Sequence, residues 1–246
     1  MLKREWSSTP TGPLVSPWLI SARDSRVITL FGSIVSSIDV PLVATESIPF
    51  VAEDVFASLL QLAGEDSAQP VRLVINNSGG SVPAGLTIIQ GIEHLQAKGI
   101  DVEVIVLGSA MSMASVILAA GTVGKRFALE RSRIHLHSGQ IGLPQDRPDD
   151  VNRIMDFING VREELYVILA RRTKLAEYYL KCNDLPLDKK TLADEGKRIK
   201  FIKNLLEKET FLTPREAVTA GIVDEILSPG YPRIDALFRP GKRGHK

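Results

Sequence analysis

The feature that most constrains the fold is a regular alternation of strand-like and helical segments between residues 26 and 137. Short runs rich in β-branched residues indicate strands, and the longer stretches between them carry apolar residues at helical spacing. Strands joined through helices form right-handed β-α-β crossovers and a largely parallel sheet. The sequence therefore predicts an α/β fold. Strands are expected at 26–32, 70–76, 101–108 and 133–137, and helices at 53–65 and 82–99.

A different pattern follows this sheet region. Residues 149–181 carry an amphipathic stripe over several turns, which predicts a long helix. The basic run 197–208 is expected to be the solvated face of a further helix, with phosphate binding as the alternative. The stretch "TPREAVTAG" (213–221) offers a capping threonine, a proline for the first turn, a capping-box glutamate and a closing glycine, which predict a short helix. Residues 222–227 are then expected to return as a strand.

Charge and cysteine content exclude several classes of protein. Thirty basic and 29 acidic residues nearly cancel, so electrostatics indicates neither a nucleic-acid partner nor a membrane-surface partner. The single cysteine, Cys182, excludes an internal disulfide framework and any zinc cluster built from cysteines.

The two ends and the most apolar run bear on location. Residues 1–25 lack the apolar core of a signal peptide and are expected to form a flexible arm, and 231–246 a peripheral tail, which leaves one domain over 26–230. The uncharged run 104–121 is borderline in length for a membrane span. Its β-branched beginning and Gly108 favour a strand followed by a buried helix. We therefore expect a cytoplasmic protein with no membrane segment.

The stretch "NNSGGS" (76–81) lies between a predicted strand and a predicted helix. This places it at the carboxyl edge of the sheet, where α/β proteins bind ligands. Adjacent glycines allow positive φ angles and let a backbone N–H point outward, where it can bind an anion or an oxyanion. The alternative interpretation is an ordinary turn.

A second junction at the same edge, "GSAMSMAS" (108–115), carries three serines. Ser109 is placed to cap the helix, and Ser115 to pack inside it. Ser112 lies near the first turn, where its hydroxyl can face solvent and the N–H of Met113 lies beside it at the positive end of the helix. This arrangement has the physics of a nucleophile elbow, although the G-x-S-x-G signature is absent.

A nucleophilic serine needs a base, and "RIHLH" (133–137) offers two. His135 and His137 alternate on one strand, so both project from the same face. We expect His137, nearer the carboxyl end, to be the base and His135 to be a packing or supporting residue. Metal ligation is the alternative, but no acidic or cysteine partner lies nearby at ligand spacing, so no metal is expected. The residues alone leave the orienting acid open among Asp194, Glu195, Glu207, Glu209 and Asp224.

Three blocks resemble, in order and spacing, the signature blocks of the ClpP family of serine peptidases. They are "VINNSGGSVPAG", "GSAMSMASVILAAGTVGKRFALERSRIHLH" and "FLTPREAVTAGIVDEI", and the resemblance covers roughly residues 26–228. It implies the ClpP/crotonase-like fold. The family's nucleophile falls on Ser112 and its catalytic histidine on His137. Its oxyanion donors fall on the N–H groups of Gly79 and Met113.

The family's acid position is a departure. Its aspartate falls on Glu209, which is one methylene longer and reaches the imidazole only if the backbone shifts slightly. Glutamate fills this role in other serine hydrolases, so we expect Glu209 to be the acid. Ser78 replaces the usual proline, and Ala114 replaces a glycine. Two segments, near 37–52 and 176–200, resemble insertions.

The resemblance also implies an activity and an assembly. It implies an endopeptidase that degrades unfolded polypeptides inside two stacked heptameric rings fed by an AAA+ unfoldase, with the helix near 149–181 as a protruding handle between the rings. No cofactor is expected. The backbone of Gly80, Ser81 and Val82 is expected to pair with substrate as an added strand. Two alternatives are a non-catalytic scaffold subunit of a mixed ring and an acyl-CoA enzyme of the crotonase type.

Overall fold

The computed structural model describes residues 26–36, 50–65, 69–139, 148–228 and 230. The arm predicted for 1–25, the tail 231–246 and most of the proposed insertion near 37–52 lie outside these residues.

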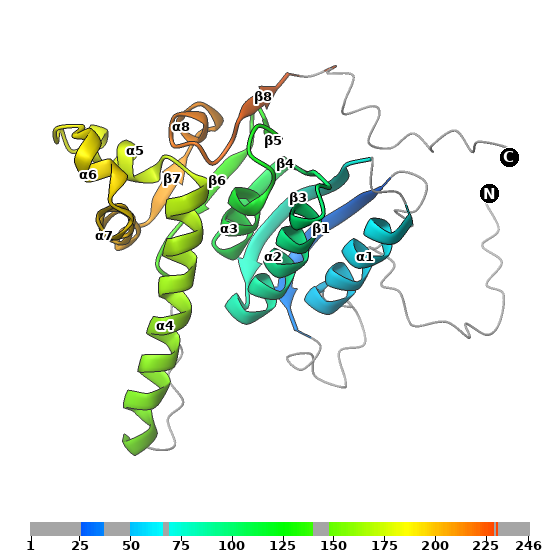
Figure 1. Cartoon of the computed structure of the whole chain (residues 1–246), viewed down its shortest axis with the longest axis horizontal. Coiled ribbons are helices and arrows are strands. Elements are labelled where there is room, and N and C mark those ends of the chain that lie inside the picture. The colour runs from blue at the N-terminus through cyan, green and yellow to red at the C-terminus, as the bar shows by residue number, and fades with distance from the viewer. Residues whose placement is uncertain (1–25, 37–49, 66–68, 140–147, 229, 231–246) are drawn as a thin grey trace, which may run out of the picture.

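A mostly parallel sheet forms the centre of the fold (Figure 1). Its main path runs β2-β1-β3-β4-β5-β8, and β6 continues beside β4 and pairs with β7. Every pairing is parallel except that of β6 with β7, which is antiparallel. The predicted parallel sheet is confirmed. The strands are β1 Val27–Val35, β2 Phe50–Val51, β3 Val71–Gly80, β4 Val102–Met111, β5 Arg126–Leu129, β6 Arg133–Leu136, β7 Thr210–Leu212 and β8 Glu225–Leu227.

Helices cover one face of the sheet and extend beyond its end (Figure 1). In that view α1, α2 and α3 lie over the strands, α4 runs past the sheet and projects away from it, and α5 to α8 gather near the upper end of α4. The helices are α1 Ala52–Glu65, α2 Val82–Ala97, α3 Met113–Ala120, α4 Pro148–Arg172, α5 Leu175–Cys182, α6 Lys189–Ala193, α7 Glu195–Leu206 and α8 Pro214–Thr219.

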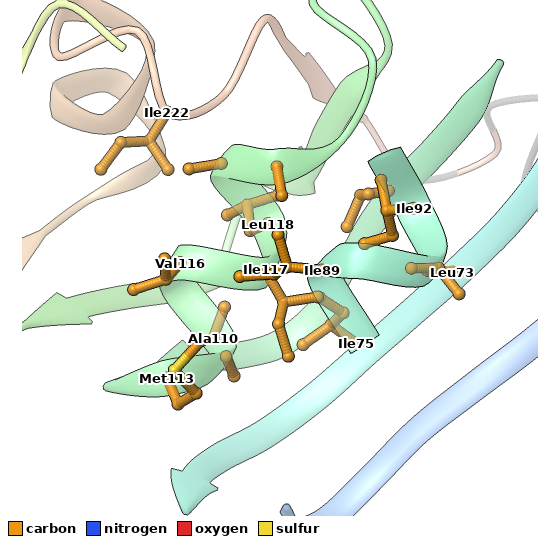
Figure 2. Packing of buried hydrophobic residues seen from close by; sticks show 14 of the residues in the cluster. Leu73, Ile75, Ile89, Ile92, Ala110, Met113, Val116, Ile117, Leu118 and Ile222 are labelled. Carbon is orange, nitrogen blue, oxygen red and sulfur yellow. The ribbon is translucent and has the colours of Figure 1, made fainter. Parts of the chain in front are cut away.

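The main core lies between the sheet and the helices α2 and α3 (Figure 2). Leu73 and Ile75 of β3 belong to the same buried cluster as Ile89 of α2 and Ile117 of α3. Burying each such side chain contributes about 1.5–3 kcal/mol. A second, smaller cluster lies apart from this one and consists of Val27, Val74, Ile105, Phe127 and Leu227.

The central strand β4 therefore contacts apolar side chains on both of its faces. Val104 and Val106 belong to the main cluster, whereas Ile105 belongs to the smaller one. A strand buried on both faces needs a continuous apolar run instead of an alternating one. This explains the uninterrupted apolar run 104–107, before which the buried Glu103 is paired with Arg72.

Two strands are longer than predicted, and this overturns one interpretation. β3 continues to Gly80 and β4 continues to Met111, so Ser109 lies inside a strand. The backbone N–H and the hydroxyl of Ser109 both donate to Asn76 Oδ1, at 3.1 and 3.2 Å. The prediction that Ser109 caps the following helix was wrong, because the Asn76 side chain on the neighbouring strand binds it.

The long helix predicted near 149–181 is two helices, because α8 interrupts it. α4 ends at Arg172 after 25 residues. The N–H of Lys174 then donates to the carbonyl of Ala220 at 2.9 Å, outside the helical ladder. Gly221 permits this close approach, since it has a φ of +66° and a Cβ there would lie 2.8 Å from the Lys174 nitrogen.

The remaining helix predictions are confirmed. α7 covers most of the basic run 197–208, and α8 has the predicted capping box between Thr213 and Glu216. The strand predicted at 222–227 is shorter than expected, since β8 begins at Glu225. The N–H groups of Ile222 and Val223 donate instead to the carbonyl of Ala217 at the end of α8.

The apolar run 104–121 is divided between β4 and α3, as the sequence predicts. Within the described residues, no helix is both long enough and apolar enough to cross a bilayer.

Candidate active site

Ser112 occupies a constrained position between β4 and α3. Its φ of +52° is rare for a residue other than glycine. Its N–H donates to the carbonyl of His135 at 2.9 Å, and its carbonyl accepts bonds from the N–H and the hydroxyl of Ser115. The Ser112 side chain makes no capping hydrogen bond to α3, so its hydroxyl can bond to a group outside the helix. A sharp, strained turn of this kind is typical of nucleophile elbows.

The imidazole of His137 lies directly beside this hydroxyl. His137 Nε2 is 2.8 Å from Ser112 Oγ. The contact follows from strand pairing: β6 runs parallel to β4 with His135 opposite Met111, so Ser112 and His137, which lie one and two residues further along, come close together. The structure therefore brings the predicted nucleophile and base within hydrogen-bonding distance.

Glu209 reaches both histidines. Because β7 is antiparallel to β6 and Thr210 lies opposite Leu136, the preceding residue comes alongside His137. Glu209 Oε1 is 3.5 Å from His137 Nδ1, which is longer than a good hydrogen bond. Its other oxygen, Oε2, bonds closely to His135 Nε2. The hydrogen bond from His135 is the main cause that holds the pKa of Glu209 below its ordinary value, and the charge of His137 lowers it further.

The other acids considered from the sequence have different places. Asp194 caps α7, Glu195 pairs with Arg171, and Asp224 pairs with Arg126. Glu207 is exposed at the end of α7. Of the five acids left open by the residues, Glu209 is the one paired with the imidazole.

The sequence analysis missed the partner of His135. Glu209 was expected to reach His137, but its bond to His135, 74 residues earlier in the chain, was not anticipated and follows from the β6–β7 pairing. His135 also packs as predicted, because its ring stacks on Phe211 with the ring centroids 4.4 Å apart. The sequence pattern that could have indicated this contact is the alternation of His135 and His137 on one strand, because two rings on the same face can share one polar partner.

Both predicted oxyanion amides lie beside Ser112. Gly79 has a φ of +96°, and a Cβ there would lie 2.7 Å from Ser112 Cβ and 3.1 Å from the Met113 nitrogen. Met113 begins α3, where an α-helix leaves its first amides without an intrahelical acceptor. The site therefore holds two backbone amides and a hydroxyl in close contact, and only glycine fits at 79.

Asn77 is a further residue that the sequence analysis did not single out. Its Oδ1 accepts a hydrogen bond of 2.7 Å from the N–H of Gly79. Asn77 is only 1% exposed, and its Nδ2 has no hydrogen-bond partner. The Gly79 amide must leave Asn77 before it can bind an oxyanion.

The backbone that follows Gly79 lies between β1 and the start of α2. The N–H of Ser81 donates to the carbonyl of Ile34 at 2.9 Å. Gly80 has a φ of +148°, and a Cβ there would lie 2.1 Å from the Ile34 carbonyl oxygen, so this backbone lies close against β1. Val82 is the first residue of α2. The edge of residues 80–81 that faces β1 is thus already paired with the sheet.

A cavity of about 320 Å³ adjoins Ser112 and His137. Its walls come largely from apolar residues of α3, α4 and α7, among them Val116, Leu165 and Leu206. Arg162 also lines it, but its guanidinium donates to the carbonyl of Gly139 at 2.8 Å. The space next to the candidate nucleophile is therefore suited to an apolar group.

Ser112, His137 and Glu209 lie in the order hydroxyl, imidazole and carboxylate, which is the order that serine hydrolases use. The family model described as "Clp protease" matches residues 22–230, most of the chain. The chain therefore belongs to the Clp protease family, a family of peptidases, and its α/β architecture is the ClpP/crotonase-like fold. The resemblance stated from the sequence blocks is confirmed.

Proposed function

We propose that this protein is a serine endopeptidase in which Ser112 is the nucleophile, His137 the base and Glu209 the acid. The observation that carries the proposal is the 2.8 Å contact between Ser112 Oγ and His137 Nε2 at a strained junction. Membership of the Clp protease family supports the same reaction class.

The proposed reaction is acyl transfer to water. His137 Nε2 takes the hydroxyl proton as Ser112 Oγ attacks a peptide carbonyl, and then donates that proton to the leaving amine. The N–H groups of Gly79 and Met113 stabilise the oxyanion, once Gly79 has exchanged Asn77 Oδ1 for it. Losing one such donor costs about 10²–10³ in rate. Glu209 holds the imidazole in the required tautomer, and a water activated by His137 releases the acyl group.

The proposed substrate is an extended polypeptide. Its backbone pairs with Gly80, Ser81 and Val82 as an added strand, which tolerates many sequences because main-chain hydrogen bonds supply the affinity. The cavity beside Ser112 takes the side chain next to the scissile carbonyl. Because its lining is mostly apolar, we expect cleavage after apolar residues to be preferred.

The proposed assembly is a pair of stacked heptameric rings that encloses the active sites and receives unfolded chains from an AAA+ unfoldase, in the cytoplasm. We treat 26–230 as its single peptidase domain. The projection of α4 from the body of the subunit supports this assembly (Figure 1). Phe157 on that helix is 66% exposed in the isolated chain, and a second subunit would cover it. Sedimentation analysis of purified protein measures the oligomer, and a Phe157→Glu variant is expected to shift it toward smaller species.

One observation favours a second candidate, a non-catalytic scaffold subunit of a mixed ring. The Gly79 amide is bound to Asn77, which leaves the oxyanion site with one donor in this arrangement. A scaffold subunit would assemble without hydrolysing peptides.

Hydrolysis of short fluorogenic peptides tests the peptidase proposal. Ser112→Ala is expected to lower kcat by about 10⁶, to the background rate. Ser109→Ala is the matched control, since Ser109 lies on the same segment but is bonded to Asn76, and we expect it to stay within a few-fold of the original rate. Activity that persists in Ser112→Ala would contradict the proposal. Assembled rings of the unmodified chain without activity would support the scaffold.

A further inference from the structure

Three side chains at the edge formed by β6 and β7 offer metal-binding atoms to a common point. Ligand atoms of His135, His137 and Glu209 all lie within 4.8 Å of one another. Among the described residues, no other group of three His, Cys, Asp or Glu side chains meets this spacing. The cluster consists of two imidazoles and one carboxylate, and the carboxylate contacts both rings.

This donor set is the one that zinc prefers at sites with an open position. Zinc binds imidazole nitrogen and carboxylate oxygen at about 2.0–2.2 Å, and two histidines with one glutamate leave a fourth place for water. Tetrahedral ligands at these bond lengths lie about 3.3 Å apart, which the three side chains reach by small rotations. Two imidazoles favour zinc over magnesium or calcium, which select oxygen ligands.

The surroundings combine a fixed ligand with an accessible one. The His135 ring is largely buried and stacked on Phe211, so its orientation is set by packing. The Glu209 side chain is 55% exposed, which gives an ion a path from solvent and room for a bound water. Backbone pairing of β6 with β7 holds the two strands that carry these groups together.

We infer that His135, His137 and Glu209 form a zinc site, and that zinc bound there switches off the hydroxyl of Ser112. Zinc on His137 Nδ1 leaves the single ring proton on Nε2, so that Nε2 donates to Ser112 Oγ instead of accepting its proton. Zinc also removes Glu209 from its role as the orienting acid. The inhibitory consequence depends on the proposed function, but the binding of zinc does not.

His135 separates the two roles of the cluster. The proposed hydrolysis needs the ring of His137 and the carboxylate of Glu209, whereas zinc binding needs the His135 ring as well. A variant at His135 therefore removes a metal ligand and leaves the Ser112–His137 contact in place.

Calorimetric titration of zinc chloride into the metal-free full-length protein, near neutral pH, tests the site directly. We expect one zinc per chain, released by EDTA. His135→Gln is expected to weaken binding by more than about tenfold, since even the loss of a residue behind a ligand costs that much. His94→Gln is the control, because His94 is exposed in the last turn of α2 and should leave the affinity unchanged. No saturable binding, or equal affinity in the original and His135→Gln chains, would overturn the inference.

Two further measurements keep the inference distinct from the peptidase proposal. Ser112→Ala should bind zinc with unchanged affinity even though it hydrolyses nothing, so a failed peptidase proposal leaves the binding test valid. In the active chain, zinc should inhibit peptide hydrolysis and EDTA should restore it. His135→Gln should require over tenfold more zinc for half-inhibition of its own zinc-free rate. If circular dichroism shows that His135→Gln does not fold, Glu209→Gln must show the same loss of zinc affinity.

Discussion

The two halves of the candidate site are built in different ways. The nucleophile half, with Ser112, Gly79 and Met113, is set by backbone: a strained turn pinned by hydrogen bonds on both sides, against which only a glycine fits. The acid half depends on one side chain, Glu209, which is 55% exposed and precedes a strand of three residues. Backbone placement tolerates almost no substitution, whereas a side chain on an exposed edge can change length and still reach its partner.

This difference explains one departure from the ClpP pattern, the glutamate at the acid position. A glutamate replaces the aspartate on the exposed edge, where the longer side chain can bend between two histidines. At Gly79 the distances leave no room for a Cβ, and the glycine is present. The acid half is therefore the part of the site where a change in side-chain length is tolerated. It is also the part where we propose that a zinc ion binds.

The sharpest test of the acid half is Glu209→Gln. Removing the charge that orients His137 is expected to lower kcat by about 10⁴, with little change in stability because the side chain is largely exposed. Glu207→Gln is the control, two residues earlier and also exposed, and should keep the original rate. Equal rates in both variants would show that the carboxylate does not support the base.

The corresponding test of the nucleophile half is Gly79→Ala. A Cβ would lie 2.7 Å from the Met111 carbonyl oxygen and from Ser112 Cβ, so the oxyanion amides must move, and kcat is expected to fall by about 10²–10³. Thermal unfolding should also show a loss of stability. Gly99→Ala has a similar φ of +77° but open space around the Cβ, so it should lose stability without losing kcat. Comparable rate losses in both variants would contradict the placement of Gly79.

Asn77→Ser probes the amide of Gly79 more gently. The serine hydroxyl is a shorter and weaker acceptor for the Gly79 amide than the Asn77 carboxamide, and a hydrogen bond of this kind contributes about 0.5–1.5 kcal/mol. The rate of acylation is therefore expected to rise, by up to about tenfold. Stopped-flow measurement of the acylation burst gives this rate. A slower acylation would mean that Asn77 supports the oxyanion site instead of competing with it.

The smallest expected effect is a shift in the titration of Glu209. Because its folded-state pKa lies below the ordinary value, the interaction with the histidines is fully present above about pH 4.3 and is lost as the pH falls through the lowered pKa. In His135→Gln the largest cause of the shift is gone, so the pKa should rise toward the ordinary value. Carbon-13 NMR of the glutamate carboxyl groups measures the titration curve of Glu209 in the original chain and in His135→Gln. An unchanged midpoint in His135→Gln would contradict the role of His135 in lowering the pKa of Glu209.

Local signals in the sequence predicted the parts of the structure that depend on neighbouring residues. The capping box of α8 lies within four residues, from Thr213 to Glu216, and was found from the sequence. The junction at Ser112 was found because a strand pattern changes to a helix pattern there. These predictions succeeded since the interactions that form each feature are close in the chain.

The predictions that failed depend on contacts between distant segments. Asn76 binds Ser109 across two strands, and Ala220 ends α4 by binding Lys174. The residues alone could not choose Glu209 among five acids, because its place is set by pairing of β6 with β7. The same pairing creates the contact between His135 and Glu209, which the sequence analysis did not anticipate.

Mapping the adduct of a fluorophosphonate probe tests the central claim most directly, because such probes phosphonylate serine hydroxyls that have been activated by a base. After incubation with the assembled full-length protein and proteolytic digestion, mass spectrometry should find the probe on Ser112, and the adduct should be absent from His137→Ala. An adduct on a different serine, or one on Ser112 that forms equally well in His137→Ala, would contradict the account.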